Sequence, residues 1–216
     1  MAKKIIYCTL FCLLASFSQA QEQQNRGFQW GLSVGAETQS LGIEPTDRLG
    51  PKETWVGSDR NKPGATLGIV GQKDIWRGLA FQTGLSFSYT SNLVKFFPNT
   101  AQTYHFTDLE LPVYLSVTNQ KASKAPLHAK ILFGPRFGWN LGRNAGDKLQ
   151  LLRERMAIDL GLGVEIRLGK WNLSPEMIYS HGLNNLHDFV GTEYDFQVGR
   201  VIRDKLAFRV VLMQAK

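Results

Sequence analysis

Two short pairs of residues towards the end of the chain hold the side chains best suited to catalysis, Ser180-His181 and His187-Asp188. A serine, a histidine and an acidic residue are the components of an acyl-transfer triad. Such a triad is recognised by its geometry, which neighbouring positions in a sequence do not provide. We therefore expect polar loop residues here and a protein that is not an enzyme. A lipid-directed hydrolase would require His181 and a serine to face the rim of the bilayer together.

The same histidines do not predict a metal site. His181 and His187 lie six positions apart beside Asp188, and this spacing matches neither a zinc site nor a calcium loop. Gly161 and Gly163 do not predict a nucleotide site, because no helical pattern follows them and the third glycine of a dinucleotide fingerprint is missing. The sequence therefore predicts no catalytic residue, no metal ligand and no cofactor.

The N-terminus has the pattern of a secretory signal peptide. Two lysines precede an apolar run over residues 5–14, and small residues then follow at the two positions that a signal peptidase requires. The run is too short to cross a bilayer as a helix. We expect residues 1–20 to be cleaved and residues 21–216 to form one domain. That domain contains no cysteine, because Cys8 and Cys12 both lie in the expected signal peptide.

Much of the remaining chain alternates apolar and polar residues with a period of two, which is typical of β-strands with one apolar face. In residues 79–89, for example, Phe81, Phe87 and Tyr89 share one face with two leucines, and small or polar residues fill the other. Segments of about this length can cross a bilayer as tilted strands. Eight segments show the alternation: residues 28–36, 65–72, 79–89, 108–117, 127–140, 156–168, 171–179 and 205–213.

The connections between these segments favour a membrane barrel over a soluble one. Long and short connections alternate: residues 37–64, 90–107, 141–155 and 180–204 are long, and residues 73–78, 118–126 and 169–170 are short. Outer-membrane barrels have short turns on the periplasmic side and long loops on the outside. The sequence therefore predicts an all-β protein, an eight-stranded, antiparallel, up-and-down transmembrane β-barrel in the outer membrane, with both termini in the periplasm.

The polar faces of these strands carry charges of both signs. A barrel of eight strands has an interior just wide enough for side chains, and an unpaired charge there is costly. We therefore expect a filled lumen in which ion pairs stiffen the barrel and glycines leave room for long side chains. The predicted lumen charge network consists of Asp108, Glu110, Lys130, Arg136, Asp159, Glu165, Arg167, Glu176 and Arg209.

Aromatic residues lie near the ends of several predicted strands or turns. Tryptophan and tyrosine are enriched where a membrane protein passes from hydrocarbon to water, and in barrels they form two girdles. The predicted interfacial aromatics are Trp30, Trp76, Tyr89, Trp139, Trp171 and Tyr179.

Four segments in this order resemble the PorT-type outer-membrane β-barrel proteins of the Bacteroidetes. Residues 108–115, Asp-Leu-Glu-Leu-Pro-Val-Tyr-Leu, are similar to the family's strand in which an acidic residue precedes Leu-Pro. Residues 128–139 contain Leu-Phe-Gly-Pro and look like the next strand, and residues 159–165 look like the Gly-rich sixth strand. Residues 173–185 are similar to the family's Ser-Pro-Glu strand and its Gly-Leu-x-Asn loop. The resemblance covers most of residues 21–216.

Three prolines lie inside the predicted strands, at Pro112, Pro135 and Pro175. A proline removes one hydrogen bond from a sheet and is usually found at an edge or a bulge. Because these prolines fall at places that match the family resemblance, we expect bulges or bends rather than breaks. The chain departs from many outer-membrane barrels at its end, Gln214-Ala215-Lys216, because it lacks a terminal aromatic residue.

The resemblance implies a role in protein export, because PorT supports the type IX secretion system of the Bacteroidetes. We therefore expect a non-enzymatic accessory or assembly component of that system, which acts by binding through its outer loops or its periplasmic turns. Three other functions stay open: a structural or adhesive barrel of the envelope, a lipid-modifying enzyme and a small-solute pore.

Charge adds expectations about partners. The formal net charge is +7, with 25 basic and 18 acidic residues. The basic residues are scattered along the chain, so we expect no nucleic acid partner. The expected partners are outer-membrane lipid or lipopolysaccharide and other secretion-system proteins. The loop residues that could meet anionic lipopolysaccharide are Arg48, Lys52, Arg60, Lys62, Arg143 and Lys148.

Overall fold

The computed structural model describes residues 27–46, 56–76, 78–96, 100–119, 127–142, 149–191 and 194–214. The expected signal peptide, residues 1–20, lies outside these ranges. Within the described part of the chain, no helix is long and apolar enough to cross a membrane.

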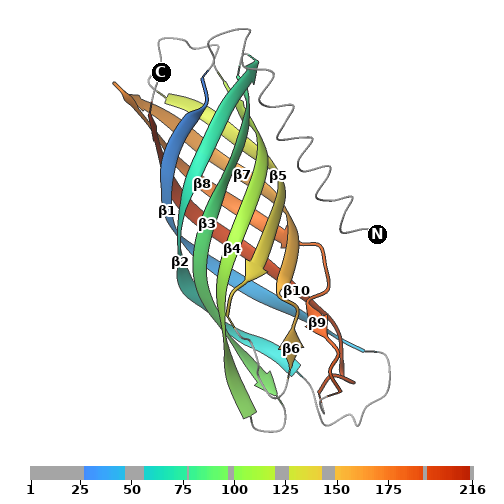
Figure 1. The fold of residues 1–216 in the computed structure, drawn as a ribbon. Coiled ribbons are helices and arrows are strands. Elements are labelled where there is room, and N and C mark those ends of the chain that lie inside the picture. The colour runs from blue at the N-terminus through green and yellow to red at the C-terminus, as the bar shows by residue number, and fades with distance from the viewer. Residues whose placement is uncertain are drawn as a thin grey trace.

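Eight antiparallel strands form a closed barrel, which confirms the predicted fold class. Each strand pairs with its neighbour along the chain, and the first strand pairs with the last. Figure 1 shows the strands winding around the barrel at a tilt. The barrel strands are β1 (Gln29–Pro45), β2 (Val56–Trp76), β3 (Leu79–Phe96), β4 (Thr100–Thr118), β5 (Leu127–Asn140), β7 (Glu154–Leu168), β8 (Trp171–Gly182) and β10 (Val198–Gln214).

A separate two-stranded sheet lies beyond one end of the barrel. It pairs β6 (Gln150–Leu151) with β9 (His187–Asp188). We call this end of the barrel the loop end and the opposite end the turn end. At the turn end, β2–β3 and β7–β8 are joined by very short turns, whose Gly78 and Gly169 have φ angles of 76° and 60°. Glycine adopts this left-handed conformation without steric cost, which allows such tight reversals.

The strands are longer than the sequence predicts, and most of the extra length lies at the loop end. Residues 90–107, predicted as a loop, instead belong largely to β3 and β4, which leave only residues 97–99 between them. β1 and β10 extend in the same direction. The predicted strict alternation of long and short connections is therefore wrong: β4 begins four residues after the end of β3 at the loop end, whereas β5 begins nine residues after the end of β4 at the turn end.

The three strand prolines interrupt neither strands nor register. β4, β5 and β8 continue through Pro112, Pro135 and Pro175, and their partners keep one register on both sides. The expected bulges therefore lie elsewhere, for example between Glu44 and Pro45. Beside Pro135, a Cβ on Gly134 would lie 2.0 Å from the Val113 carbonyl oxygen, so glycine permits the close approach of β5 to β4.

The polarity of the barrel wall inverts along its length. Towards the turn end, β4 turns Leu115 and Val117 outwards, where they are exposed, and buries Asp108 and Glu110 inside. Towards the loop end, the same strand buries Tyr104 and Phe106 inside and turns polar residues outwards. The first part therefore has the surface of a protein in lipid, whereas the second has the apolar interior of a protein in water.

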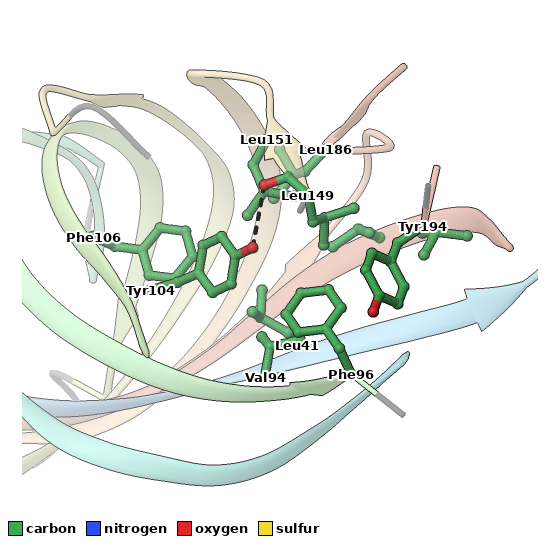
Figure 2. Packing of buried hydrophobic residues seen from close by; sticks show 11 residues of the cluster. Leu41, Val94, Phe96, Tyr104, Phe106, Leu149, Leu151, Leu186 and Tyr194 are labelled. Atoms are coloured by element: carbon green, nitrogen blue, oxygen red, sulfur yellow. Dashed lines mark hydrogen bonds between the residues drawn. The ribbon is translucent and has the colours of Figure 1, made fainter. Parts of the chain in front are cut away.

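The apolar interior at the loop end is a single cluster, which we call the loop-end cluster. Tyr104 donates a 3.3 Å hydrogen bond to the carbonyl oxygen of Leu149, and the Phe96 ring meets the Tyr194 ring edge-on at 4.9 Å. Figure 2 shows these side chains converging from strands and loop segments far apart in the sequence. The buried members are Leu41, Val94, Phe96, Tyr104, Phe106, Leu149, Leu151, Leu186, Tyr194, Val198 and Val201.

Candidate functional site

A network of buried ion pairs fills the middle of the lumen, and Lys205 of β10 is at its centre. Its Nζ atom lies 3.0 Å from Glu37 Oε1, 3.2 Å from Asp108 Oδ2 and 2.7 Å from Glu110 Oε1. It also donates a 3.1 Å hydrogen bond to Ser88 Oγ. One fully buried ammonium group therefore ties β1, β3, β4 and β10 together across the lumen.

Two arginines extend this network towards the loop end. Arg203 binds Asp108 with both terminal nitrogens, Nη2–Oδ2 at 2.6 Å and Nη1–Oδ1 at 3.4 Å. Arg155 places Nη1 3.4 Å from Glu110 Oε1 and donates from Nη2 to Ser180 Oγ at 2.9 Å and to the Arg203 carbonyl oxygen at 3.1 Å. These contacts satisfy two bulky guanidinium groups that would be costly to bury alone.

Arg136 of β5 joins β4 to β7. Its Nη1 lies 2.7 Å from Glu110 Oε2, its Nε lies 2.7 Å from Asp159 Oδ2, and its Nη2 donates to Tyr114 Oη at 2.8 Å. The Tyr114 hydroxyl in turn donates to Asp159. Tyr114 thus gives the lumen a polar contact as well as a large ring that fills space.

Glu176 of β8 is the acidic centre of the remaining part of the network. Lys130 Nζ lies 2.7 Å from Glu176 Oε1, and Arg209 Nε donates to Oε2 at 2.8 Å. A Cβ on Gly163 would lie 3.0 Å from the Glu176 Cγ, so glycine at this position leaves room for the glutamate, as the sequence predicts.

The structure brings most of the predicted lumen charges together, but two of them lie apart. Asp108, Glu110, Lys130, Arg136, Asp159, Glu176 and Arg209 are buried and paired in the network. Glu165 and Arg167 form a separate pair at 3.9 Å at the mouth of the lumen, where the Arg167 side chain is 48% exposed. The end of β7 lies at the open mouth of the barrel, so the long side chain of Arg167 reaches solvent there.

Four charged members of the network were not among the predicted residues: Glu37, Arg155, Arg203 and Lys205. Each continues the inward-facing alternation of its strand, but all except Lys205 lie beyond the predicted strand ends. Extending the alternation outwards from Asp159 to Arg155, and from Arg209 to Lys205 and Arg203, would have identified three of them.

Buried side chains continue on both sides of the network. The loop-end cluster covers one side, and a smaller group of Val70, Val211 and Met213 lies towards the turn end. At the turn end itself the lumen widens into a polar cavity of about 230 Å³, lined in part by Gln72 and Asn172. Among the described residues, therefore, side chains fill the lumen at its middle and its loop end, and a cavity lies at its turn-end mouth.

The six predicted interfacial aromatics are all exposed on the outer wall. Trp30, Trp76 and Trp171 lie at the turn end of their strands, and Tyr89, Trp139 and Tyr179 lie further along β3, β5 and β8. Ten residues of a strand tilted by about 40° rise about 25 Å, which is the height of the apolar band of a membrane barrel.

The tyrosines mark the loop-end edge of this band. Tyr89 shares a 3.0 Å hydrogen bond with His105 Nδ1, and Tyr179 donates a 3.2 Å hydrogen bond to Asp204 Oδ2. In both cases the ring lies on the apolar wall and the hydroxyl reaches a polar group. This is the arrangement that suits a tyrosine at the boundary between hydrocarbon and water.

A charge introduced into the middle of the apolar band should destabilise the barrel strongly in lipid. Leu162 lies near the middle of β7 and is 55% exposed. We expect Leu162→Arg to lower the free energy of unfolding by about 2–4 kcal/mol in lipid vesicles. Urea titration of the refolded protein measures this value. Ala101→Arg, at an exposed position of β4 near the loop end, should cost less than about 1 kcal/mol. Equal costs at the two positions would contradict the placement of the band.

The residues best suited to catalysis do not form a triad. Ser180 points into the lumen, where it accepts a hydrogen bond from Arg155, whereas His181 faces outwards and lies 3.0 Å from Asp204. They are on opposite faces of β8. His187 is buried against Asp195 at 3.1 Å, and not against Asp188. The condition for a lipid-directed hydrolase, a serine and His181 facing one surface together, is therefore not met by Ser180.

The sequence predicts no metal site, and it predicts basic loop residues that could meet lipopolysaccharide. Among the described residues, no group of three or more histidine, cysteine, aspartate or glutamate side chains could hold a metal ion. Lys62 is exposed on β2. Arg48, Lys52, Arg143 and Lys148 lie outside the described residues, as does the side chain of Arg60.

A closed barrel with an apolar outer band and a filled, charged lumen defines the class of small outer-membrane β-barrels. No family model matches the sequence, and no curated protein matches it. Solved structures do match. The outer membrane protein OprG from Pseudomonas aeruginosa has a TM-score of 0.53 at 11% identity, with 89% of this chain and 97% of OprG covered. This likeness establishes the fold.

Two further outer-membrane barrels match with lower scores. AlkL, solved by solid-state NMR in lipid bilayers, has a TM-score of 0.49 at 11% identity, with 90% of this chain and 92% of AlkL covered. Neisserial surface protein A has a TM-score of 0.43 at 13% identity, with 86% of this chain and 97% of that protein covered.

Proposed function

We propose that this chain is a non-enzymatic integral protein of the outer membrane, PorT-like, which acts as an accessory or assembly component of type IX protein secretion. The observation that carries the proposal is the filled lumen. Because Lys205, Arg136 and their partners occupy the interior, the barrel has no room for a protein cargo. Its contribution to export is therefore binding, through its loops or turns.

The proposed orientation places the turn end in the periplasm. Very short turns join β2 to β3 and β7 to β8 at this end, as is typical of the periplasmic side of outer-membrane barrels. β1 begins and β10 ends at this end, which supports the prediction that both termini lie in the periplasm. The loop end, with the β6–β9 sheet, then faces the outside of the cell.

The PorT resemblance supports the secretion role. Its four motifs supply much of the lumen network, including Asp108, Arg136, Asp159 and Glu176. The segments that carry the resemblance thus contain many of the residues whose ion pairs stabilise the barrel. The surfaces that would meet secretion partners are the turns and the loops, of which the motifs include only the Gly-Leu-x-Asn loop after β8.

Deletion of the gene in the native host tests the proposal. We expect type IX cargo to accumulate in the periplasm and to be depleted from the medium, with the wild-type gene restoring export. A plasmid copy carrying Leu160→Val, on the exposed outer wall of β7 and away from the loops and turns, serves as a folded control. Unchanged export would contradict the secretion role and leave the barrel itself in place.

The filled lumen also predicts that the barrel is not a pore. Purified protein in planar bilayers should show no steady open-channel conductance, because ion pairs and the loop-end cluster occupy the cross-section. An eight-stranded barrel has no spare width to bypass them. Stable single-channel steps that persist across preparations would contradict the filled lumen and favour the small-solute pore.

One feature favours a second candidate, an adhesive barrel. In the segment between β8 and β10, Phe189, Val190 and Phe196 are exposed, and the two rings meet edge-on at 5.2 Å. Asp195 holds this segment in shape, because its carboxylate accepts hydrogen bonds from the backbone of Val190 at 3.1 Å and of Gly191 at 2.9 Å. A rigid apolar tip on the outer face suits contact with another surface.

Cell-attachment assays separate the two candidates. If the barrel is adhesive, Phe189→Ser combined with Phe196→Ser should reduce attachment and leave cargo export unchanged. If it serves secretion alone, deletion of the gene should reduce export, and the double variant should attach like the wild type.

A further inference from the structure

The wall of the barrel splits between β1 and β2 at the loop end. These two strands pair with each other only as far as Glu37 and Gly64, and no further pair follows among the described residues. Beyond this point β1 stays paired with β10 up to Pro45, and β2 stays paired with β3 as far as Val56. Each strand therefore continues with a neighbour on one side only.

The side of residues 38–45 that faces away from β10, which we call the β1 edge, carries main-chain donors and acceptors. The carbonyl oxygen of Gln39 faces this side, because it accepts a 3.1 Å hydrogen bond from the Asn92 side chain of β3. Main-chain groups point to alternate edges along a strand, so those of Leu41 and Ile43 face the same side. In the described part of the chain, no strand pairs with them there. Their N–H and C=O groups are therefore spaced as in a β-ladder that lacks its second strand.

The β1 edge begins where the apolar band ends. Tyr89, which marks the loop-end edge of the band, pairs with Ala65, and Ala65 pairs with Ala36 of β1. The β1 edge follows directly after this level, and Gly42 and Glu44 on its outer face are exposed. An unpaired strand edge would be costly in hydrocarbon, whereas in water it can receive another strand.

The corresponding edge of β2 is protected against strand addition, and the β1 edge is not. Lys62 and Pro63 are exposed on β2, and the register of β2 with β3 shifts on both sides of this part of the strand. Proline removes a main-chain donor, and lysines and bulges prevent edge pairing in natural sheets. By contrast, β1 keeps one register with β10 from Gly31 to Glu44. The β1 edge is therefore the regular edge, along which a further strand can align.

We propose that the β1 edge binds an extended polypeptide segment of a partner protein by strand addition. The inner face of the added strand continues the loop-end cluster, because Leu41 belongs to this cluster and Ile43 and Val56 pack against it. The partner segment therefore alternates apolar and polar side chains. A second copy of this chain does not fit, because the β1 strands of two barrels in one membrane would cross at about 80°, twice the usual strand tilt. Only the assignment of the partner to secretion rests on the proposed function.

The test uses the purified barrel in lipid nanodiscs and a short fluorescent peptide in which valine alternates with threonine and a lysine stands at each end. We expect saturable binding in fluorescence anisotropy. Hydrogen exchange, measured by NMR, should be faster at the Leu41 and Ile43 amides than at those of Ser40 and Gly42, and bound peptide should slow it. The same peptide with every main-chain amide methylated has no donors and should not bind.

Matched variants of Ile43 locate the binding. Ile43→Pro removes one donor from the β1 edge and leaves the pairing with β10 in place, so the barrel should fold and bind the peptide about tenfold more weakly. Ile43→Val keeps the donor and should bind like the wild type. If Ile43→Pro lacks the heat-modifiable mobility of a folded barrel, the methylated peptide and the exchange rates decide the matter.

Three results would overturn the inference. They are equal binding of the two peptides, Leu41 and Ile43 amides that exchange as slowly as those of Ser40 and Gly42 in the free barrel, and a dimer of barrels that the Ile43→Pro variant does not form. None of them depends on cargo export, so a failure here is distinct from a failure of the secretion role.

Discussion

A Lys205→Met variant should lose about 3–5 kcal/mol of the free energy of unfolding. Removing one member of a buried ion pair leaves its partner charged, buried and uncompensated. Lys205 contacts three carboxylates within 3.2 Å, and its replacement leaves Glu37 without this ion pair. Asp108 and Glu110 still have arginine partners, so the barrel should fold but unfold at lower urea.

The measurement is urea unfolding in lipid vesicles, read by tryptophan fluorescence and by heat-modifiable gel mobility. Lys170→Met is the matched control, since Lys170 is exposed at the β7–β8 turn and should change stability by less than about 0.5 kcal/mol. Arg167→Met should also have a small effect, because Arg167 is at the rim. A Lys205 variant as stable as these controls would contradict a central role for this lysine.

Phe106→Ala should have an effect of similar size, about 3–5 kcal/mol, for a different reason. Phe106 is buried in the loop-end cluster, and truncating a large core ring leaves a cavity. It also lies under the Arg203 guanidinium, whose Cζ is 4.7 Å from the ring centre. The substitution therefore disturbs the contact between the cluster and the charge network.

Phe196→Ala is the matched control for this substitution. Phe196 lies at the same end of the barrel but is 60% exposed, so its loss should cost less than about 1.5 kcal/mol. Unfolding in vesicles and protease resistance of the loop end measure both variants. If Phe106→Ala were no more sensitive to protease than Phe196→Ala, the loop end would not depend on an apolar core.

The sequence predicted the membrane-facing part of the fold well, because that part follows one simple rule. Most apolar residues of the eight predicted segments face outwards and most polar residues inwards, although Leu132, Ile178 and Val211 are apolar and buried inside, and all eight segments overlap barrel strands. The lumen residues between Asp108 and Arg209 could be predicted in the same way, since a polar residue in phase with its strand must point inwards.

The loop-end extensions could not be predicted by this rule, because the rule reverses there. On β4 the apolar positions are odd-numbered from Leu109 onwards, yet Tyr104 and Phe106 are even-numbered and still point inwards. The strand does not change phase; its environment changes from lipid to water. In the sequence, the outward apolar alternation therefore ends where the strand leaves the band, although the strand itself continues. Leu41 of β1 and Val94 of β3 show the same reversal.

The ion-pair partners within the lumen could not be predicted from the sequence, and the reason is geometric. Period-two alternation assigns a side chain to the lumen but gives neither its height nor its reach across the barrel. Lys205 meets Glu37 on the neighbouring strand and Glu110 on the opposite part of the wall. The stagger of the strands determines which inward-facing side chains lie at the same height in the lumen. This stagger depends on the register of all eight strand pairings together.

The lumen network also constrains the order of assembly. Lys205 and Glu37 are 168 positions apart, and Arg203 and Asp108 are 95 apart, so these pairs form only when the chain is nearly complete. Contacts so distant in sequence make folding slow. A lone β10 entering hydrocarbon would carry Arg209 near the middle of the bilayer at a cost of about 2–4 kcal/mol, with Lys205 and Arg203 at the loop-end edge of the band. Insertion of the last strand and closure of the barrel must therefore occur as one step, with the carboxylates of the earlier strands already in position to receive it.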